Sequence, residues 1–188
     1  TISAASGSVN NRLACEQGIA KPECNLRLYQ VMVESFVDGD PAANYNNGYG
    51  TSHHKGDIQG IINSLDYIKS TGANAIWITP IFTSTAETGQ NASTDKLDAT
   101  GYFASDYFSI DPKFGSMAKA KELVDTAHAK GLYVFFDGVF GHHKANLVAS
   151  PLGNLPVDLA ATTGLNRNAD YTDPKTLAFY KEVAEFWV

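Results

Sequence analysis

Short apolar runs alternate with helical repeats along this chain. The runs "LRLYQVMV", "NAIWITPIF" and "LYVFFDGVF" are rich in β-branched and aromatic residues, and they predict strands at residues 28–33, 74–79 and 132–137. Because these runs are apolar at successive positions, both faces of each strand carry apolar side chains, which is typical of a parallel sheet. We expect the three strands to be adjacent and parallel.

Between the strands, apolar residues recur at the spacing of an α-helix. From residue 58 to 70 they fall three, four and seven positions apart, and Gly72 stands where a helix C-terminus is expected. A second helix is predicted at 117–130, ending at Gly131, and a third within the segment "DPKTLAFYKEVAEFWV". The polar segments between these elements are predicted loops, at residues 38–56, 83–101 and 141–173.

The order strand, helix, strand, helix, strand predicts parallel βα units. A complete (β/α)8 barrel takes about 250 residues, whereas this chain has 188. The prediction is therefore an α/β fold, the N-terminal part of a TIM (β/α)8 barrel with about three βα units and a long insertion after strand 3. We expect an N-terminal extension at residues 1–25 and the first three barrel strands at 26–140. An inserted loop or small domain is expected at 141–173, and barrel helix 3 at 174–188.

Amino-acid composition and charge limit the kinds of molecule that the chain is expected to bind. The chain is 44% hydrophobic and 11% aromatic, which indicates a globular protein with a sizeable core. A formal charge of −6 with no cluster of Lys or Arg argues against binding nucleic acid or anionic lipid. No apolar run approaches the roughly 20 residues of a membrane span, and the start lacks the regions of a signal peptide, so any signal is expected to have been removed. A neutral or small polar substrate is favoured.

Cys15 and Cys24 are the two cysteines, close together in a polar N-terminal segment. A disulfide between them would fit a secreted or periplasmic protein, and we favour it. Spacing alone does not prove the bond, and free surface thiols are the alternative for a cytosolic protein.

The stretch "FFDGVFGHHK" joins a predicted strand to paired histidines. In a parallel barrel, residues at the carboxyl ends of strands face the active site, and Asp137 stands there with His142 shortly after it. A turn or helix cap is the alternative role for Asp137. A zinc site at His142 and His143 is disfavoured because adjacent side chains diverge and no third ligand follows at a usual spacing; the same holds for His53 and His54.

This stretch resembles a region of the α-amylase family, glycoside hydrolase family 13, in which a strand-3 Asp is followed four residues later by Asn and then His. Asp137 and His142 match that pattern, and Gly141 takes the Asn position. Three further stretches agree in order: "LYQVMVESFVDGDPAAN", "KGDIQGIINSLDYIKSTGANAIWITPIF" and "GYFASDYFSIDPKFGSMAKAKELVDTAHAKGL". The resemblance extends from about residue 26 to 188.

The resemblance implies an enzyme that cleaves or transfers α-glucosidic bonds with retention, acting on an α-linked glucan or oligosaccharide. The family's catalytic carboxylates follow strands 4, 5 and 7, so we expect none in this chain, and the rest of the barrel is a candidate partner as a second chain. Tyr102 resembles the residue that stacks on the sugar, His142 the one that hydrogen-bonds its hydroxyls, and Asp137 the acid that orders the site. An ordinary core aromatic is the alternative for Tyr102.

A calcium site is predicted in a second region. The stretches "DGDPAANYNNGYG" and "KGD" crowd oxygen ligands together, as Ca²⁺ requires. They resemble a calcium loop of cyclodextrin glycosyltransferases and related amylases, which implies ligation by Asp38, Asp40, Asn44 and Asp57, with Ala43 as a departure. An acidic turn is the alternative. The family's other calcium site relies on the Asn that is here Gly141, so one site is expected.

Two other classes of function stay open at this point. One is a carbohydrate- or calcium-binding fragment without catalysis, and the other is an unrelated parallel α/β enzyme, which would make the four ordered motifs coincidental. The sequence does not specify the glucoside, endo or exo action, or hydrolysis versus transglycosylation.

Overall fold

A computed structural model describes residues 22–43, 54–84, 100–160 and 166–188. Its main sheet has three parallel strands in the order β1-β2-β5, namely β1 (Leu28–Val31), β2 (Ala75–Ile78) and β5 (Tyr133–Phe136). This arrangement confirms the prediction of adjacent parallel strands. The first strand is shorter than predicted, because the chain turns into the 3-10 helix η2 (Val33–Ser35) directly after Met32; another, η1 (Pro22–Asn25), precedes β1.

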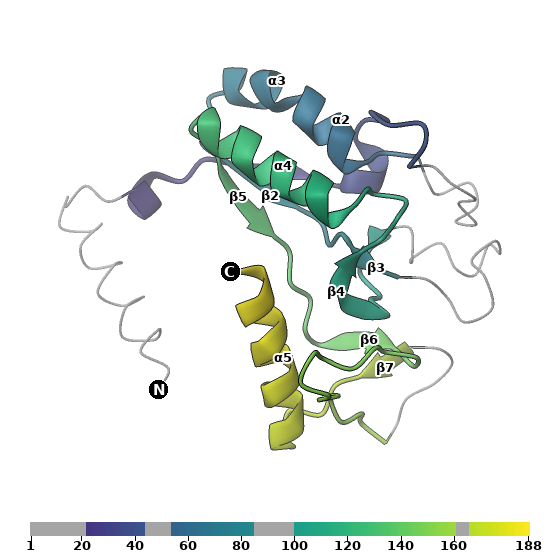
Figure 1. Cartoon of the computed structure of the whole chain (residues 1–188). Helices are drawn as coiled ribbons and strands as arrows, with labels where there is room; N and C mark the ends of the chain where they lie inside the picture. Colours follow the sequence, from purple (N-terminus) through teal and green to yellow (C-terminus); the bar gives the residue numbers. More distant parts are fainter. Residues whose placement is uncertain (1–21, 44–53, 85–99, 161–165) are drawn as a thin grey trace.

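Three helices cover one face of this sheet, as Figure 1 shows: α2 (Ile58–Asn63), α3 (Leu65–Ser70) and α4 (Met117–Ala129). The main core lies between them and the alternate strand residues that point toward them, with Ile61, Leu65, Ile76 and Leu123 fully buried. Burial of such side chains is the main source of stability, at about 25 cal/mol per Å² of apolar surface.

The helix predicted at 58–70 is interrupted, which corrects the prediction of one continuous helix. Ser64 stands between α2 and α3 with φ −102° and ψ 1°, and its hydroxyl donates to the Gly60 carbonyl at 2.8 Å. Serine side chains that bond to the backbone of the preceding turn compete with the helical ladder. The apolar repeat continues across the break, so the sequence pattern does not reveal it.

The second core surrounds the last helix, α5 (Pro174–Trp187), which matches the predicted third helix. Asp173 caps it by accepting from the Lys175 amide at 2.8 Å, and Pro174 opens the first turn. Its buried face, with Phe179, Tyr180 and Val183, packs on Phe82 and Tyr107.

Two antiparallel strand pairs occupy segments that were predicted largely as loops or left unassigned. One joins β3 (Phe82–Thr83) to β4 (Asp106–Ile110), and the other joins β6 (His142–Lys144) to β7 (Asn166–Asn168). The segment 141–173, predicted as an inserted loop or small domain, thus contains a short antiparallel strand pair. The strands "HHK" and "NRN" are short and polar, so no alternation of apolar residues announces them.

The second face of the main sheet is not covered by any described residue. Leu28, Trp77, Tyr133 and Phe135 project from it with exposures of 51%, 37%, 43% and 41%. Parallel sheets are normally buried on both faces, so this apolar face is suited to contact further polypeptide. Among the described helices, none has the length and apolar character to cross a membrane.

Candidate functional site

Tyr102, Asp137 and His142 lie together at the carboxyl end of the main sheet. The Tyr102 hydroxyl donates to Asp137 Oδ2 at 3.1 Å, and His142 Nε2 lies 2.7 Å from the Tyr102 carbonyl oxygen. The residues that form these bonds are 35 and 40 positions apart in the sequence. The structure thus brings all three predicted substrate-binding residues into one group.

Asp137 reaches this position as the first residue after β5. Its amide donates to the Ile78 carbonyl at 3.0 Å, which continues the parallel pairing of β2 and β5 by one step. The side chain therefore leaves the sheet at its carboxyl edge, where the active sites of α/β barrels are built.

Tyr102 is placed by a close backbone approach. Gly101 has φ +82°, and a Cβ atom on it would lie 2.0 Å from the Pro80 carbonyl oxygen. Only glycine fits this contact without displacement. Because Pro80 follows β2 by two residues, the contact holds Tyr102 beside the carboxyl end of the sheet.

A buried ion pair joins the residue that follows β3 to the turn that follows β4. Lys113 Nζ lies 3.0 Å from Asp111 Oδ2, which also accepts from the Ser84 amide at 3.0 Å. Burial alone would raise the pKa of Asp111, but the Lys113 ammonium and the amide donors outweigh it and hold the pKa below its usual value. The carboxylate is therefore ionised and ties Ser84, at the end of β3, to the turn after β4.

His142 is oriented by two contacts. Since a carbonyl oxygen only accepts, Nε2 carries the hydrogen in the bond to the Tyr102 carbonyl. The Phe103 ring packs on the imidazole with centroids 4.7 Å apart and a tilt of 43°. These two contacts fix the orientation of the imidazole beside the Tyr102 backbone.

The Tyr102 hydroxyl stays protonated over a wide pH range. Burial, the hydrogen bond to Asp137 and the charge of that carboxylate raise the pKa of Tyr102 to about 12. The phenol is thus a donor to Asp137 at neutral pH, and its ring takes no part in that bond.

The paired histidines point to different partners, as expected for adjacent residues. His143 is buried, its Nδ1 donates to the Lys144 carbonyl at 2.7 Å, and its Nε2 lies 2.9 Å from Asp158 Oδ1. Within the described parts of the chain, no group of three or more His, Cys, Asp or Glu residues is arranged to hold a metal ion. His53 lies outside these parts, so the expectation for the His53 and His54 pair is not addressed.

The predicted calcium ligands are only partly visible. Asn44 lies outside the described residues. Asp57 is fully buried, and its carboxylate accepts from the amides of Gly60 at 2.6 Å, Asp40 at 2.8 Å and Gly39 at 3.2 Å. It caps α2 and anchors the preceding loop, a role its place before the helical repeat could have indicated. The described residues alone do not form a cation site, and calcium binding stays a prediction.

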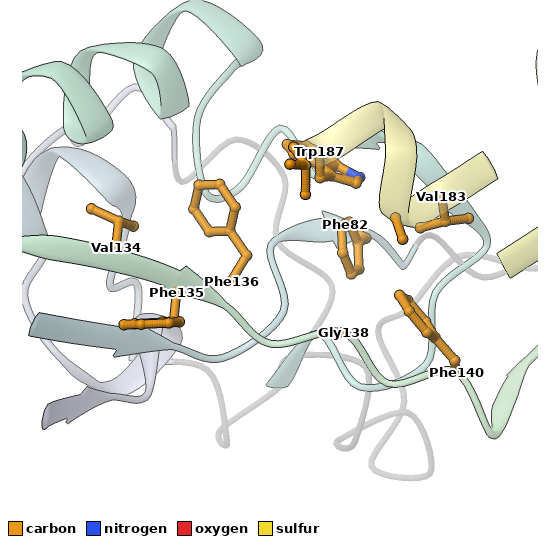
Figure 2. A pocket seen from close by; sticks show the side chains of 10 residues that line it. Phe82, Val134, Phe135, Phe136, Gly138, Phe140, Val183 and Trp187 are labelled. Atoms are coloured by element: carbon orange, nitrogen blue, oxygen red, sulfur yellow. The ribbon is translucent and has the colours of Figure 1, made fainter. Parts of the chain in front are cut away.

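An apolar cavity of about 430 Å³ lies between β5 and α5 (Figure 2). Phe82, Phe136, Phe140 and Trp187 line it, and none of the three candidate sugar-binding residues does. Its lining side chains are apolar apart from the Trp187 indole, whose Nε1 donates to the Tyr107 carbonyl at 2.8 Å, so the described residues give this cavity no free polar side chain to orient a sugar.

Comparison with known proteins decides the family. The model of the α-amylase catalytic domain matches residues 30–149. The chain belongs to the α-amylase family. The domain of this family is a TIM barrel, and the described part of the chain is a partial α/β arrangement consistent with it.

The relatives of this α-amylase-family chain are longer than it is. A cyclomaltodextrinase from Thermoanaerobacter pseudethanolicus is 42% identical over 61% of this chain and 19% of the relative. A beta/alpha-amylase from Paenibacillus polymyxa is 34% identical over 78% of this chain and 12% of the relative. The structure of AmyP in complex with maltose is 65% identical with a TM-score of 0.75, over 86% of this chain and 31% of that chain, and its complex with maltotriose gives the same values. This chain spans less than a third of each.

Sequence reasoning missed several residues that build this α-amylase-family site. Gly101, Phe103 and Tyr107 place or orient the three predicted residues, yet only the glycine carries a local signal, since it precedes Tyr102 directly. The predicted disulfide is not settled, because Cys15 lies outside the described residues, although Cys24 is not a free thiol.

Proposed function

We propose that this chain is the N-terminal part of the catalytic barrel of an enzyme that acts on α-glucans or α-linked oligosaccharides with retention. The observation that supports it most is the convergence of Tyr102, Asp137 and His142 at the carboxyl edge of the sheet, joined by direct hydrogen bonds. Relatives named as a cyclomaltodextrinase and a beta/alpha-amylase, and AmyP bound to maltose, support the substrate class.

In this proposal each side chain has a distinct role. The flat apolar face of a glucose ring stacks on Tyr102, whose hydroxyl is already engaged by Asp137. Asp137 fixes the orientation of the Tyr102 ring through the hydrogen bond to its hydroxyl. His142, whose ring is bonded to the Tyr102 backbone carbonyl, contacts the sugar hydroxyls. These groups bind and orient the sugar without breaking the bond, because retention needs a nucleophile and an acid/base about 5 Å apart. We place those carboxylates in the remainder of the barrel, in the same polypeptide or as a second chain.

The test compares variants of the complete enzyme on a chromogenic maltooligosaccharide. Tyr102→Ala should lower kcat/KM by about ten- to a hundredfold, because an aromatic platform is worth roughly 1–3 kcal/mol. His142→Ala should cost at least as much. Tyr67→Ala, which truncates an exposed aromatic residue on α3, is the control. Full activity in both site variants would show that the sugar binds elsewhere.

We further propose a secreted or periplasmic protein with a Cys15–Cys24 disulfide. Its support is the absence of a free thiol at Cys24 and the polar N-terminal segment. Intact mass before and after reduction and alkylation tests it, since two thiols reactive without reductant would contradict the bond.

A further inference from the structure

The turn that carries Asp137 and His142 is held by four consecutive carbonyl groups. Val139 and His142 accept from the Tyr107 hydroxyl at 2.8 and 3.0 Å. The Phe140 carbonyl accepts from the Tyr171 hydroxyl at 2.7 Å, and the Gly141 carbonyl accepts from the Ala169 amide at 3.0 Å. The path of the backbone from Asp137 to His142 is thus set largely by groups outside the turn.

Tyr107 is the buried member of this set. It lies on β4 with an exposure of 1%, and its ring is packed among four aromatic rings, with centroid distances of 5.2 Å to Phe82, 6.1 Å to Phe140, 5.9 Å to Phe179 and 5.6 Å to Tyr180. A ring enclosed in this way presents its hydroxyl at a fixed point. Burial, together with the nearby Tyr180, raises the pKa of Tyr107, so the hydroxyl keeps its proton as a donor.

We propose that Tyr107 is a positioning residue for the sugar site, whose hydroxyl bridges the Val139 and His142 carbonyls and so fixes His142 relative to Asp137. The inference rests on the proposed function and deepens it. A hydroxyl has one proton, so it serves the two carbonyls in turn or shares the proton between them, and either arrangement keeps both ends of the 139–142 segment close to one point. Tyr107 touches no substrate in this account and acts through the backbone of His142.

Tyr171 also donates to this turn, but it makes one bond and is more exposed than Tyr107, so the two residues can be compared. The Tyr171 hydroxyl holds one carbonyl instead of two, and half of the residue is exposed. Water can replace the exposed hydroxyl of Tyr171 at small net cost, whereas Tyr107 is buried, so water replaces its hydroxyl less readily. The loss of the hydroxyl should therefore be felt far more at Tyr107 than at Tyr171.

The variant Tyr107→Phe in the complete enzyme isolates the hydroxyl, because the phenyl ring keeps the aromatic packing. On a chromogenic maltooligosaccharide, kcat/KM should fall by about ten- to a hundredfold, as expected for a displaced binding group. Tyr171→Phe should cost less than about threefold, and Tyr67→Phe, an equal chemical change on α3, should have no effect. Unchanged kcat/KM in Tyr107→Phe would overturn the proposal.

A double-mutant cycle separates positioning from general destabilisation. If Tyr107 acts through His142, Tyr107→Phe should cost little when added to His142→Ala, whereas a purely structural role predicts the same loss in both backgrounds. Equal losses would reject the positioning role.

Hydrogen exchange provides a readout that does not depend on the substrate. The amides of Asp137 and Lys144, bonded to the Ile78 and Ala104 carbonyls, flank the turn. Tyr107→Phe should speed exchange in this peptide, and unchanged exchange would contradict the positioning role. If the unmodified complete enzyme does not turn over α-glucans, the proposed function is wrong. The exchange experiment would still test the positioning role, because it needs no substrate.

Discussion

At the scale of residues, the site depends on one phenol held by one carboxylate. The Tyr102 hydroxyl is engaged by Asp137, so the ring has a defined orientation without a ligand. An aromatic side chain that is already fixed in its binding orientation loses little conformational entropy when a ligand binds. More of a weak stacking interaction then contributes to the affinity.

The raised pKa of Tyr102 predicts a change in stability at high pH. An unfolded tyrosine ionises near pH 10 and the folded Tyr102 near 12, so between these values the unfolded state has lost its proton and the folded state has not. The contribution of Tyr102 to stability is complete below about pH 10 and is lost as the pH rises through about 12. In urea unfolding at pH 9, 10.5 and 11.5, Tyr102→Phe should therefore lose less stability than the parent protein. Tyr133→Phe is the control, and equal losses in the parent and Tyr102→Phe would contradict this link.

The three candidate sugar-site residues could be selected from the sequence, but their mutual contacts could not be predicted from it. Asp137 follows an apolar strand and matches a family motif together with His142, and a separate motif carries Tyr102. The bond between Tyr102 and Asp137 spans 35 positions, and the contacts of Tyr107 with the turn span 32 and 35. Contacts of this range depend on how β3 and β4 pack against the end of β5, which local patterns do not encode.

At the scale of elements, the loops that deliver the site are fixed by backbone fit. Ser84, which follows β3, is tied to the buried Asp111–Lys113 pair, and Ser105, which precedes β4, donates its amide hydrogen to the Thr83 carbonyl at 2.8 Å. Between these anchors and Tyr102, Gly101 touches Pro80. The position of Tyr102 therefore depends on a residue that has no side chain.

Gly101→Ala is predicted to disrupt the site. The new methyl group would meet the Pro80 carbonyl oxygen at 2.0 Å, so the backbone beside Tyr102 must move. We expect about a hundredfold or greater loss of kcat/KM in the complete enzyme, because displacements of about 1 Å at a site cost that much. Gly131→Ala is the matched control: its φ of +74° is similar, but nothing lies within 4 Å of the added atom. Similar activity losses in the two variants would show that left-handed strain alone explains the effect.

Asp57 links helix α2 to the predicted calcium loop. Its carboxylate holds three backbone amides, so Asp57→Ala should lower stability by about 2–4 kcal/mol even without calcium, since a cap is worth about 1 kcal/mol and two further part-buried amides lose an acceptor. Asp38→Ala should leave that cap intact and remove only a gain due to the ion.

The calcium prediction is tested by melting temperature in EDTA and in excess Ca²⁺. Calcium should raise the melting temperature of the parent protein. The gain should shrink in Asp38→Ala and vanish when Asp57→Ala is added. A gain that persists in the double variant removes Asp38 and Asp57 from the ligand set, and no gain in the parent removes the site.

Element types followed from the sequence where a strong apolar pattern existed. The helices α4 and α5 and the three parallel strands match their predictions closely. The break at Ser64 and the pairing of β6 with β7 were missed, because a serine hydroxyl in a continuous apolar repeat and two polar tripeptides give no periodic signal.

At the scale of the whole molecule, helices cover one face of the main sheet, and none of the described residues covers the other. Helices α2, α3 and α4 bury one side, while Trp77 and Phe135 stand opposite each other in register on the uncovered side, flanked by Leu28 and Tyr133. An apolar patch of this kind on an isolated chain is a site of association. In a closed barrel the same side chains would be interior.

We therefore predict that the isolated 188-residue chain has no catalytic activity and self-associates through its exposed apolar surface. It should show no turnover of a chromogenic maltooligosaccharide, because retention needs paired carboxylates that we place elsewhere in the protein. It should bind an apolar dye such as ANS and self-associate in sedimentation, and Trp77→Ser with Phe135→Ser should reduce both, because neither side chain belongs to the helix-covered core. Adding the remainder of the barrel as a second polypeptide should suppress dye binding. Turnover by the isolated chain would show that the catalytic groups lie within it, and dye binding unchanged by the double substitution would show that the open face is not the surface that associates.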